Sequence, residues 1–375
     1  MKTAPTNENL YNIIIKTTNF CCLECDYCYI EPHQSKFAKS VLSLEIVTRI
    51  LLDYLEIINN QDAKNNRIIK LTWHGGEPLM AGLPYFREIV KLEKKLIKPP
   101  YKVINSITTN GTLLDMEWIE FFKRENFQVG ISLDGPEYFH NLHRKYHSGI
   151  GSFDKVFNAI TLLKEQNVPY GILTVITSEL SKNPKKIFDF FVSNELKNVN
   201  FIPFTTPSNW LSPDEYTNFL IQFFDLWYKL DDPTFYIRDF VNILARIFGN
   251  ESNLCEYSNC FGNYLGLDTN GDIYMCDLLI GNSDFLLSNI MESSLQNILS
   301  SEKYKKMKLI ASKNAPSCQT CLYFMICTGG CMYRRYLATN SLPGKDIYCS
   351  SRKSLISHML YTLEQDRVKL FSKTS

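Results

Sequence analysis

The chain has 375 residues, with 40 Lys and Arg against 39 Asp and Glu, and this near-zero net charge excludes a polybasic nucleic-acid binder. Hydrophobic residues make up 45% and charged residues 21%, a composition typical of a folded globular chain of about two domains. The N-terminus lacks the apolar segment of a secretory signal, and no apolar run approaches the roughly 18 residues of a membrane-spanning helix. We therefore expect a cytoplasmic protein without membrane association, in which clustered cysteines are more often metal ligands or catalytic groups than disulfides.

Strand-like and helix-like segments alternate over the first two thirds of the chain. Short apolar runs predict six strands, at residues 11–16, 68–73, 103–107, 129–133, 171–177 and 199–202. Apolar residues at helical spacing predict helices at residues 44–58, 84–97, 116–124, 153–165, 184–192, 214–231 and 237–249. Such alternation indicates a parallel α/β sheet with right-handed crossovers, either a barrel or an open sheet. In both, ligands bind at the carboxyl ends of the strands.

The 12 cysteines fall into two blocks separated by a long cysteine-free segment. The first block follows the first predicted strand and contains Cys21, Cys25 and Cys28 at the spacing C-x3-C-x2-C, with Cys22 as a further thiol. A structural zinc ion needs four ligands, normally from two Cys-x2-Cys pairs, so a zinc site or a reactive dithiol is the less favoured interpretation. Three neighbouring thiolates suit a [4Fe–4S] cluster with one iron open to an external ligand, and Cys22 is expected not to be a ligand.

The ends of the next predicted strands also carry polar motifs. The second strand is followed by Gly75-Gly76-Glu77-Pro78, in which glycines permit close backbone approach and Glu77 can accept hydrogen bonds from an ammonium group. The third strand ends in Thr-Thr-Asn-Gly-Thr at residues 108–112. The fourth strand ends near Ser132, and Arg144 follows shortly after it.

With these motifs in this order, the sequence resembles the radical S-adenosylmethionine (SAM) superfamily over about residues 11–360. The resemblance implies a partial (βα)6 TIM-type barrel in residues 1–235. It also implies a cluster on Cys21, Cys25 and Cys28 that cleaves SAM to a 5′-deoxyadenosyl radical, which then abstracts a hydrogen atom. By the same resemblance the SAM contacts are Tyr27 near adenine, Ser132 at the ribose, Arg144 at the carboxylate, and Gly75, Gly76 and Glu77 at the amino group. Taken alone, Arg144 would be interpreted as a surface charge and His74 as a core or orienting histidine.

The second cysteine block lies in a loop-rich, glycine-containing region that is a candidate for metal-stabilised folding. Zinc ribbons are one interpretation of its spacing. The layout resembles the SPASM extension of radical SAM enzymes, which carries two auxiliary [4Fe–4S] clusters. The resemblance implies one cluster on Cys255, Cys260, Cys276 and Cys331 and another on Cys318, Cys321, Cys327 and Cys349, both relaying electrons. We expect a bridging helical segment at residues 236–254, the SPASM domain at 255–360 and a tail at 361–375.

Two activities fit such an enzyme. The favoured prediction is a maturase that cross-links a ribosomally made precursor peptide, for example into a cyclophane, because Trp73-His74 before the Gly-Gly-Glu-Pro motif resembles such maturases. The alternative is an anaerobic sulfatase maturase that oxidises Cys or Ser to formylglycine. Those enzymes more often have Gln at the position of His74, but the chain length and Asp277 favour this alternative.

Asp277 directly follows a predicted cluster ligand, where sulfatase maturases have a proposed base; a solvated loop carboxylate is the other interpretation. The expected partners are the precursor peptide or the sulfatase, and a low-potential electron donor such as flavodoxin or ferredoxin. A non-enzymatic iron–sulfur or zinc scaffold would explain the cysteines but not Glu77, Ser132 and Arg144 in register.

Overall fold

The computed structural model describes residues 12–30, 39–60, 68–258 and 264–374, and it divides into two compact units. Unit 1 is made from residues 1–132, 144–170 and 261–310, and unit 2 from residues 133–143, 171–260 and 311–375. Each unit therefore combines segments from both halves of the chain.

Unit 1 is built on a sheet with the strand order β10-β9-β8-β1-β2-β3-β4. The pairs β1–β2, β2–β3, β3–β4 and β1–β8 are parallel, whereas β8–β9 and β9–β10 are antiparallel. The strands are β1 (Asn12–Thr18), β2 (Ile68–Gly75), β3 (Lys102–Thr109), β4 (Gln128–Ser132), β8 (Tyr264–Leu267), β9 (Asp272–Tyr274) and β10 (Leu286–Asn289).

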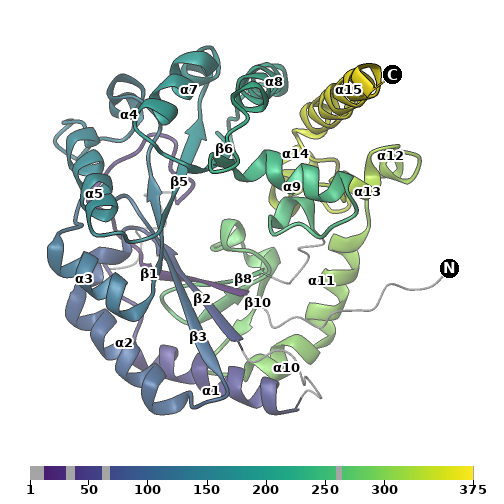
Figure 1. The fold of residues 1–375 in the computed structure, drawn as a ribbon. Helices are drawn as coiled ribbons and strands as arrows, with labels where there is room; N and C mark the ends of the chain where they lie inside the picture. Colours follow the sequence, from purple (N-terminus) through teal and green to yellow (C-terminus); the bar gives the residue numbers. More distant parts are fainter. Residues whose placement is uncertain (1–11, 31–38, 61–67, 259–263, 375) are drawn as a thin grey trace. The chain divides into compact units, whose positions relative to one another are not determined.

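Helices of unit 1 follow these strands and lie outside them (Figure 1). They are α1 (Leu44–Asn60), α2 (Leu83–Leu96), α3 (Met116–Glu125), α5 (Phe153–Glu165), α10 (Leu295–Ser300) and α11 (Glu302–Ser312), with the short turns η2 (Pro78–Ala81), η4 (Asp277–Leu279) and η5 (Ser283–Phe285). Local sequence sets their ends. In α3, the Asp115 side chain accepts a hydrogen bond from the Trp118 N–H at 3.1 Å, and Asn126 ends the helix with a φ of 54°.

The core of unit 1 is aromatic and contains a buried polar chain. Phe86 packs edge-to-face against Trp73 and Trp118, with ring centroids 5.7 and 5.5 Å apart. The Trp73 indole N–H donates to Asn105 Oδ1 at 2.7 Å, and Asn105 Nδ2 in turn donates to Glu93 Oε2 at 2.9 Å. Burial raises the pKa of Glu93 to about 7, so this carboxyl group carries a desolvation cost at neutral pH.

Unit 2 contains a second set of parallel strands, in which β6 (Asn198–Pro203) pairs with both β5 (Tyr170–Ile176) and β7 (Tyr236–Ile237). Phe201, Phe223 and Phe240 pack together in its core, and the ring centroids of Phe201 and Phe223 are 4.8 Å apart. Its helices are α4 (Glu137–His143), α6 (Ser178–Ser181), α7 (Pro184–Ser193), α8 (Pro213–Leu230), α9 (Arg238–Ile247), α12 (Pro316–Gln319), α13 (Phe324–Cys327), α14 (Met332–Thr339) and α15 (Cys349–Thr374), with the turn η3 (Cys255–Tyr257).

The six predicted strands and their helices are present, with ends that differ by a few residues, and Tyr11 lies outside the described residues. The predicted loop-rich region differs more. It contains β8, which pairs with β1 in the register Asn12↔Tyr264 to Ile15↔Leu267, so a segment assigned to a separate domain extends the first sheet. The helix α15 also continues past residue 360, where a tail was expected. The strands of this region, β8, β9 and β10, are only three or four residues long, which is too short for a periodic pattern of apolar residues to show in the sequence. The predicted domain bounds stay predictions.

No helix among the described residues is long and apolar enough to cross a membrane.

Candidate functional site

The loop that carries the first cysteine block is held by the backbone that follows β2. The amide groups of Gly76 and Glu77 donate to the carbonyl oxygens of Thr18 and Phe20, each at 2.9 Å. A Cβ atom on Gly76 would lie 2.0 Å from the Phe20 carbonyl oxygen, so only glycine fits there. Gly75 has a φ of +107°, which also favours glycine. The glycine pair is thus needed for the chain's own packing, and contact between these glycines and SAM stays a prediction.

Glu77 is fully buried at the centre of this arrangement. Its Oε1 accepts hydrogen bonds from the Thr109 hydroxyl at 2.7 Å and the Leu79 N–H at 3.0 Å, and its Oε2 accepts one from the Asn110 N–H at 2.8 Å. Burial raises the pKa of Glu77 to about 7 even though these donors oppose the shift. No Lys, Arg or His among the described residues forms an ion pair with it. A buried carboxylate that has no ion pair among these residues suits a cationic ligand such as an ammonium group.

The thiols of the first block contact the end of β3. Asn110 Nδ2 lies 3.5 Å from Cys21 Sγ and 3.4 Å from Cys22 Sγ, and Cys22 Sγ lies 3.2 Å from the Thr112 hydroxyl. A hydrogen bond from Cys21 is the main reason that the pKa of Cys22 falls to about 5. Sequence reasoning gave Asn110 and Thr112 no role, although their place in the Thr-Asn-Gly-Thr motif after β3 was a signal.

The remaining cysteines of the block, Cys25 and Cys28, lie in the same loop, and Cys28 is exposed. Three thiols in one short loop, beside a buried carboxylate that forms no ion pair within the described part of the chain, fit a cluster with a cationic ligand. That Cys21, Cys25 and Cys28 bind it stays a prediction.

Tyr27 and Arg144 lie together beside this loop. The Arg144 guanidinium stands 5.3 Å from the centre of the Tyr27 ring, and the two residues are 7% and 9% exposed, so Arg144 is not a surface charge. The residues after Arg144 run along the loop, where Lys145 O accepts from the Glu24 N–H at 2.7 Å and His147 Nε2 lies 3.1 Å from Cys21 O. Ser132 ends β4. The predicted roles of Tyr27, Ser132 and Arg144 toward SAM stay predictions.

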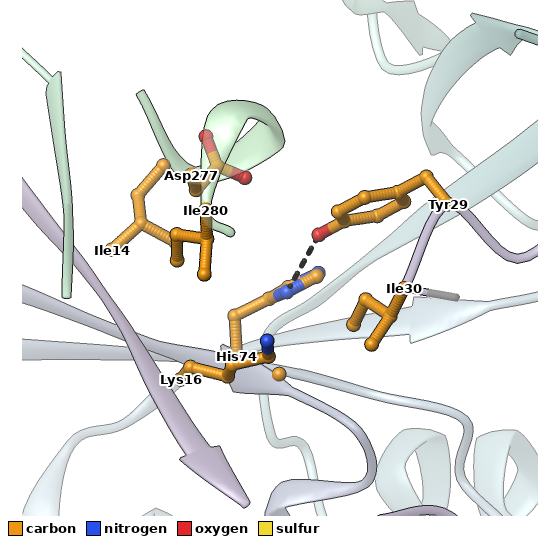
Figure 2. Close-up of a pocket in the computed structure, with 8 residues that line it drawn as sticks. Ile14, Lys16, Tyr29, Ile30, His74, Asp277 and Ile280 are labelled. Carbon is orange, nitrogen blue, oxygen red and sulfur yellow. Dashed lines mark hydrogen bonds between the residues drawn. The ribbon is translucent and has the colours of Figure 1, made fainter. Parts of the chain in front are cut away.

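Asp277 lies in a pocket of unit 1 formed by strands β1 and β2 and the turn η4 (Figure 2). The pairing of β8 with β1 brings η4 to this place, and Gly266 in β8 permits the contact, because a Cβ atom there would lie 2.7 Å from Asp277 Cα. Asp277 is partly buried and its Oδ1 lies 3.5 Å from Cys276 Sγ, so it is not a freely solvated loop carboxylate. The pocket is lined by Ile14, Lys16, Tyr29, Ile30, His74, Gly75, Asp277 and Ile280.

Two polar residues of this pocket, His74 and Tyr29, contact each other. His74 Nδ1 lies 3.2 Å from the Tyr29 hydroxyl, as Figure 2 shows, and the two rings stack with centroids 6.2 Å apart. Burial lowers the pKa of His74, with Asp277 opposing the shift, so the imidazole is neutral at pH 7. Lys16 Nζ lies 3.5 Å from Asp268 Oδ1. Sequence reasoning gave His74 no catalytic role and missed Lys16 and Tyr29. The position of Lys16 and Tyr29 on either side of the first cysteine block could have indicated that they lie near the site.

In unit 2 the structure brings together the four cysteines predicted to hold one auxiliary cluster. Cys318, Cys321, Cys327 and Cys349 line one pocket with an empty volume of about 410 Å³, part of it open to solvent. Burial raises the pKa of Cys318 and of Cys349, and Lys353 opposes both shifts. Among the described residues, no group of three or more His, Cys, Asp or Glu side chains lies close enough together to hold a single metal ion. Four thiols around a wider space fit a cluster better than a zinc ion.

The predicted ligands of the other auxiliary cluster are divided between the two units. Cys255 and Cys331 belong to unit 2 and Cys276 belongs to unit 1, whereas Cys260 lies outside the described residues. The grouping of these four cysteines therefore stays a prediction.

A buried ion-pair network supports the cysteine-bearing segments of unit 2. The guanidinium groups of Arg334 and Arg352 both contact the carboxylates of Glu256 and Asp346. Burial alone would raise the pKa of both carboxyl groups, but the two guanidinium groups hold each below its usual range. Asp346 Oδ2 also accepts the Cys331 N–H at 2.7 Å, so the network joins the chain next to Cys255, Cys331 and Cys349.

Comparison with known proteins matches both halves of the chain. The model of the radical SAM superfamily matches residues 15–191, and that of an iron–sulfur cluster-binding domain, SPASM, matches residues 255–322. The cysteine-type anaerobic sulfatase-maturating enzyme of Clostridium perfringens is 30% identical over 360 residues, which cover 92% of this chain and 95% of that protein. The serine-type anaerobic sulfatase-maturating enzyme of Bacteroides thetaiotaomicron is 29% identical over 95% of this chain and 91% of its own length.

Solved structures agree with these matches. The structure of native anSMEcpe with bound AdoMet and the Cp18Cys peptide has a TM-score of 0.85 and 28% identity to this chain, covering 96% of it and 99% of the solved chain. The predicted fold class, a radical SAM partial barrel with a SPASM region, is thereby confirmed, as are SAM and [4Fe–4S] clusters, auxiliary ones included, as the implied cofactors. The chain therefore belongs to the SPASM-containing family of radical SAM enzymes that includes the anaerobic sulfatase-maturating enzymes.

Proposed function

We propose that this enzyme is a sulfatase maturase, which oxidises a Cys or Ser side chain of a sulfatase to formylglycine. The observation that carries the proposal is the 30% identity to a cysteine-type anaerobic sulfatase-maturating enzyme over 92% of the chain. The favoured prediction from sequence was a peptide cross-linking maturase, and the comparisons support the alternative better. Because relatives of the cysteine type and of the serine type are similar to this chain to the same degree, identity does not choose between the two side chains.

The burial of Trp73 weakens the argument from sequence for a cross-linking enzyme, which relied on Trp73-His74 before the Gly-Gly-Glu-Pro motif. Trp73 is completely buried, its ring packs on Phe86, and its indole N–H donates a hydrogen bond to Asn105. A tryptophan in that position serves the core of unit 1 and carries no information about the substrate. His74 is different because its side chain lines the pocket with Asp277, and it remains a position where this chain departs from the usual Gln of sulfatase maturases.

The oxidation removes a hydrogen atom from the substrate Cβ, a proton from its thiol or hydroxyl group, and one electron. When bound, SAM and the clusters supply the radical that takes the hydrogen atom and the acceptor for the electron. Asp277 Oδ1 or Oδ2 takes the proton, which is general-base work. For a Cys substrate the product is a thioaldehyde, which water converts to the aldehyde with release of hydrogen sulfide.

The other residues of the pocket bind and orient the substrate. Ile14, Ile30 and Ile280 give the pocket apolar walls that exclude water around a small side chain (Figure 2). The neutral His74, held by the Tyr29 hydroxyl, can donate or accept one hydrogen bond at the substrate. This pocket therefore offers one base, one orienting imidazole and room for a small reacting group.

The proposal is tested by incubating the anaerobic enzyme, SAM and dithionite with three sulfatase-site peptides that differ only in having Cys, Ser or Ala at the target position. Mass spectrometry should show formylglycine in the Cys peptide, the Ser peptide or both, with 5′-deoxyadenosine as co-product and no change in the Ala peptide. The proposal fails if 5′-deoxyadenosine forms while the target keeps its sulfur or hydroxyl group and the peptide instead loses two hydrogens in a cross-link.

A further inference from the structure

The side chain of Asn110, which directly follows β3, is directed at the first cysteine block. Asn110 is 8% exposed, and its Nδ2 lies 3.5 Å from Cys21 Sγ and 3.4 Å from Cys22 Sγ. Both distances are usual for a hydrogen bond from nitrogen to sulfur, because sulfur is larger than oxygen. An amide NH2 group carries two hydrogens, so it can donate one to each of the two sulfurs.

The other end of the Asn110 side chain fixes this orientation. Asn110 Oδ1 accepts hydrogen bonds from the Thr112 N–H at 2.9 Å and from the Thr112 hydroxyl at 2.8 Å. A backbone N–H can only donate, so the amide atom that faces it must be the oxygen, and the NH2 group must face the sulfurs. Turning the amide over would bring its NH2 group against the Thr112 N–H and leave two donors face to face.

The backbone of Asn110 is held separately from its side chain. Its N–H donates to Glu77 Oε2 at 2.8 Å, and the same carboxylate accepts the Thr109 hydroxyl at 2.7 Å. A substitution that shortens the side chain of Asn110 keeps this N–H. The donor to the sulfurs can therefore be removed while the hydrogen bond to the residue predicted to bind the SAM ammonium group is retained.

A hydrogen bond to a ligand sulfur changes the reduction potential of an iron–sulfur cluster. Reduction adds one negative charge, part of which lies on the sulfur atoms, and a hydrogen bond to a charged acceptor is stronger than one to a neutral acceptor. A donor therefore stabilises the reduced state more than the oxidised state and raises the potential. Cys21 Sγ accepts the Leu23 N–H at 3.4 Å, which comes from the cysteine loop itself, and the Asn110 amide, which comes from the end of β3.

We propose that Asn110 is a positioning residue that raises the reduction potential of the cluster predicted on Cys21, Cys25 and Cys28 through its hydrogen bond to the Cys21 sulfur. One electron passes from an external low-potential reductant to that cluster, with no bond formed or broken and no proton moved. The proposal rests on the prediction that Cys21 binds iron. It goes beyond the proposed function, because it concerns how readily the radical is generated and not what becomes of the substrate.

A redox titration of the cluster-loaded enzyme, followed by electron paramagnetic resonance, tests the proposal. S-adenosylhomocysteine has no sulfonium group to cleave, and the cluster with the open iron is recognised as the one whose signal this compound changes. In Asn110→Ala the ratio of reduced to oxidised cluster at a fixed potential should fall about tenfold, which is a midpoint potential lower by about 59 mV for one electron. In Asn110→Asp the fall should be larger, because a negative charge of nearly the same shape replaces the donor.

Cys22→Ser is the matched control, since it alters the other sulfur that the same NH2 group faces and leaves the donor to Cys21 in place. Its midpoint potential and iron content should equal those of the wild type. The Kd for S-adenosylhomocysteine should also stay at the wild-type value in Asn110→Ala, because the backbone N–H that binds Glu77 is retained.

The proposal is overturned if iron-replete Asn110→Ala has the midpoint potential of the wild type, or if Asn110→Asp does not lie below Asn110→Ala. It is also overturned if Cys22→Ser lowers the potential as much as Asn110→Ala does, or if both Asn110 variants lose the iron of this cluster, since Asn110 would then be needed for its assembly. If one Asn110 variant alone keeps its iron, its potential relative to the wild type decides. These measurements use no substrate, so failure of the wild type to make formylglycine would count against the proposed function alone.

Discussion

Replacing Glu77 with Gln should separate the charge of this residue from its shape. The side chain is fully buried and accepts three hydrogen bonds, from Leu79, Thr109 and Asn110. Gln keeps the volume but replaces one oxygen with an NH2 group. In the orientation that preserves the bonds at Oε1, that NH2 faces the Asn110 N–H, and a buried donor without an acceptor costs about 1 to 3 kcal/mol of folding free energy.

The larger effect is expected on SAM. If Glu77 binds the SAM ammonium group, the variant loses a hydrogen bond between two charged groups, and a bond of this kind contributes about 1.5 to 3 kcal/mol. At 1.4 kcal/mol per factor of ten, the Kd for SAM should rise by about 10- to 150-fold. Because burial raises the pKa of Glu77 to about 7, the wild-type affinity should also increase as the pH rises through 7, and the variant should lose this dependence.

The assay is anaerobic calorimetric titration of SAM into cluster-loaded enzyme at several pH values, with iron content and denaturant unfolding measured on the same samples. Glu93→Gln is the matched control, since Glu93 is another buried glutamate of unit 1 whose pKa is raised to about 7, but it bonds Asn105 in the core. An iron-replete Glu77→Gln enzyme that binds SAM as tightly as the wild type, with the same pH dependence, would refute this reasoning.

Three further changes have defined outcomes. Asp277→Asn should still yield 5′-deoxyadenosine but should lower formylglycine formation by on the order of 100-fold, and product at the wild-type rate would remove the base role. The folded-state pKa of Glu93, about 7, lies above the ordinary 4.5, so its contribution to the free energy of unfolding falls as the pH rises from about 4.5 to 7. Denaturant unfolding should therefore show Glu93→Gln to be more stable than the wild type at pH 8, by up to about 3 kcal/mol, with little difference near pH 4.5; equal differences at both pH values would contradict this. Anaerobic reconstitution should give about 12 irons and 12 sulfides per chain, and about 8 irons in Cys318→Ala, whereas about four irons plus zinc in the wild type would contradict the auxiliary clusters.

Several elements of the fold were predictable because they depend on neighbours in the chain. The six parallel strands and most helices follow from apolar periodicity, and ends such as that of α3 follow from Asp115 and Asn126. The spacing of Cys21, Cys25 and Cys28 reports the chemistry of one short loop in the same local way. The strands β8 to β10 escaped prediction because three or four residues carry too little periodic signal.

What the sequence by itself determined is therefore the set of chemical groups and their order: a three-cysteine loop, a Gly-Gly-Glu turn at a strand end, and a second cysteine block. The tertiary structure alone decided which distant residues share a pocket. The pairing of β8 with β1 places Asp277 beside His74, and the folding of unit 2 brings Lys345 and Lys353 into the pocket of Cys318 and Cys349. The tertiary structure also decided that Trp73 is a core residue, whereas the sequence analysis had taken Trp73 as a sign of a peptide cross-linking enzyme. The physical reason is that burial and long-range pairing are properties of the packed chain, and short-range spacing contains no record of them.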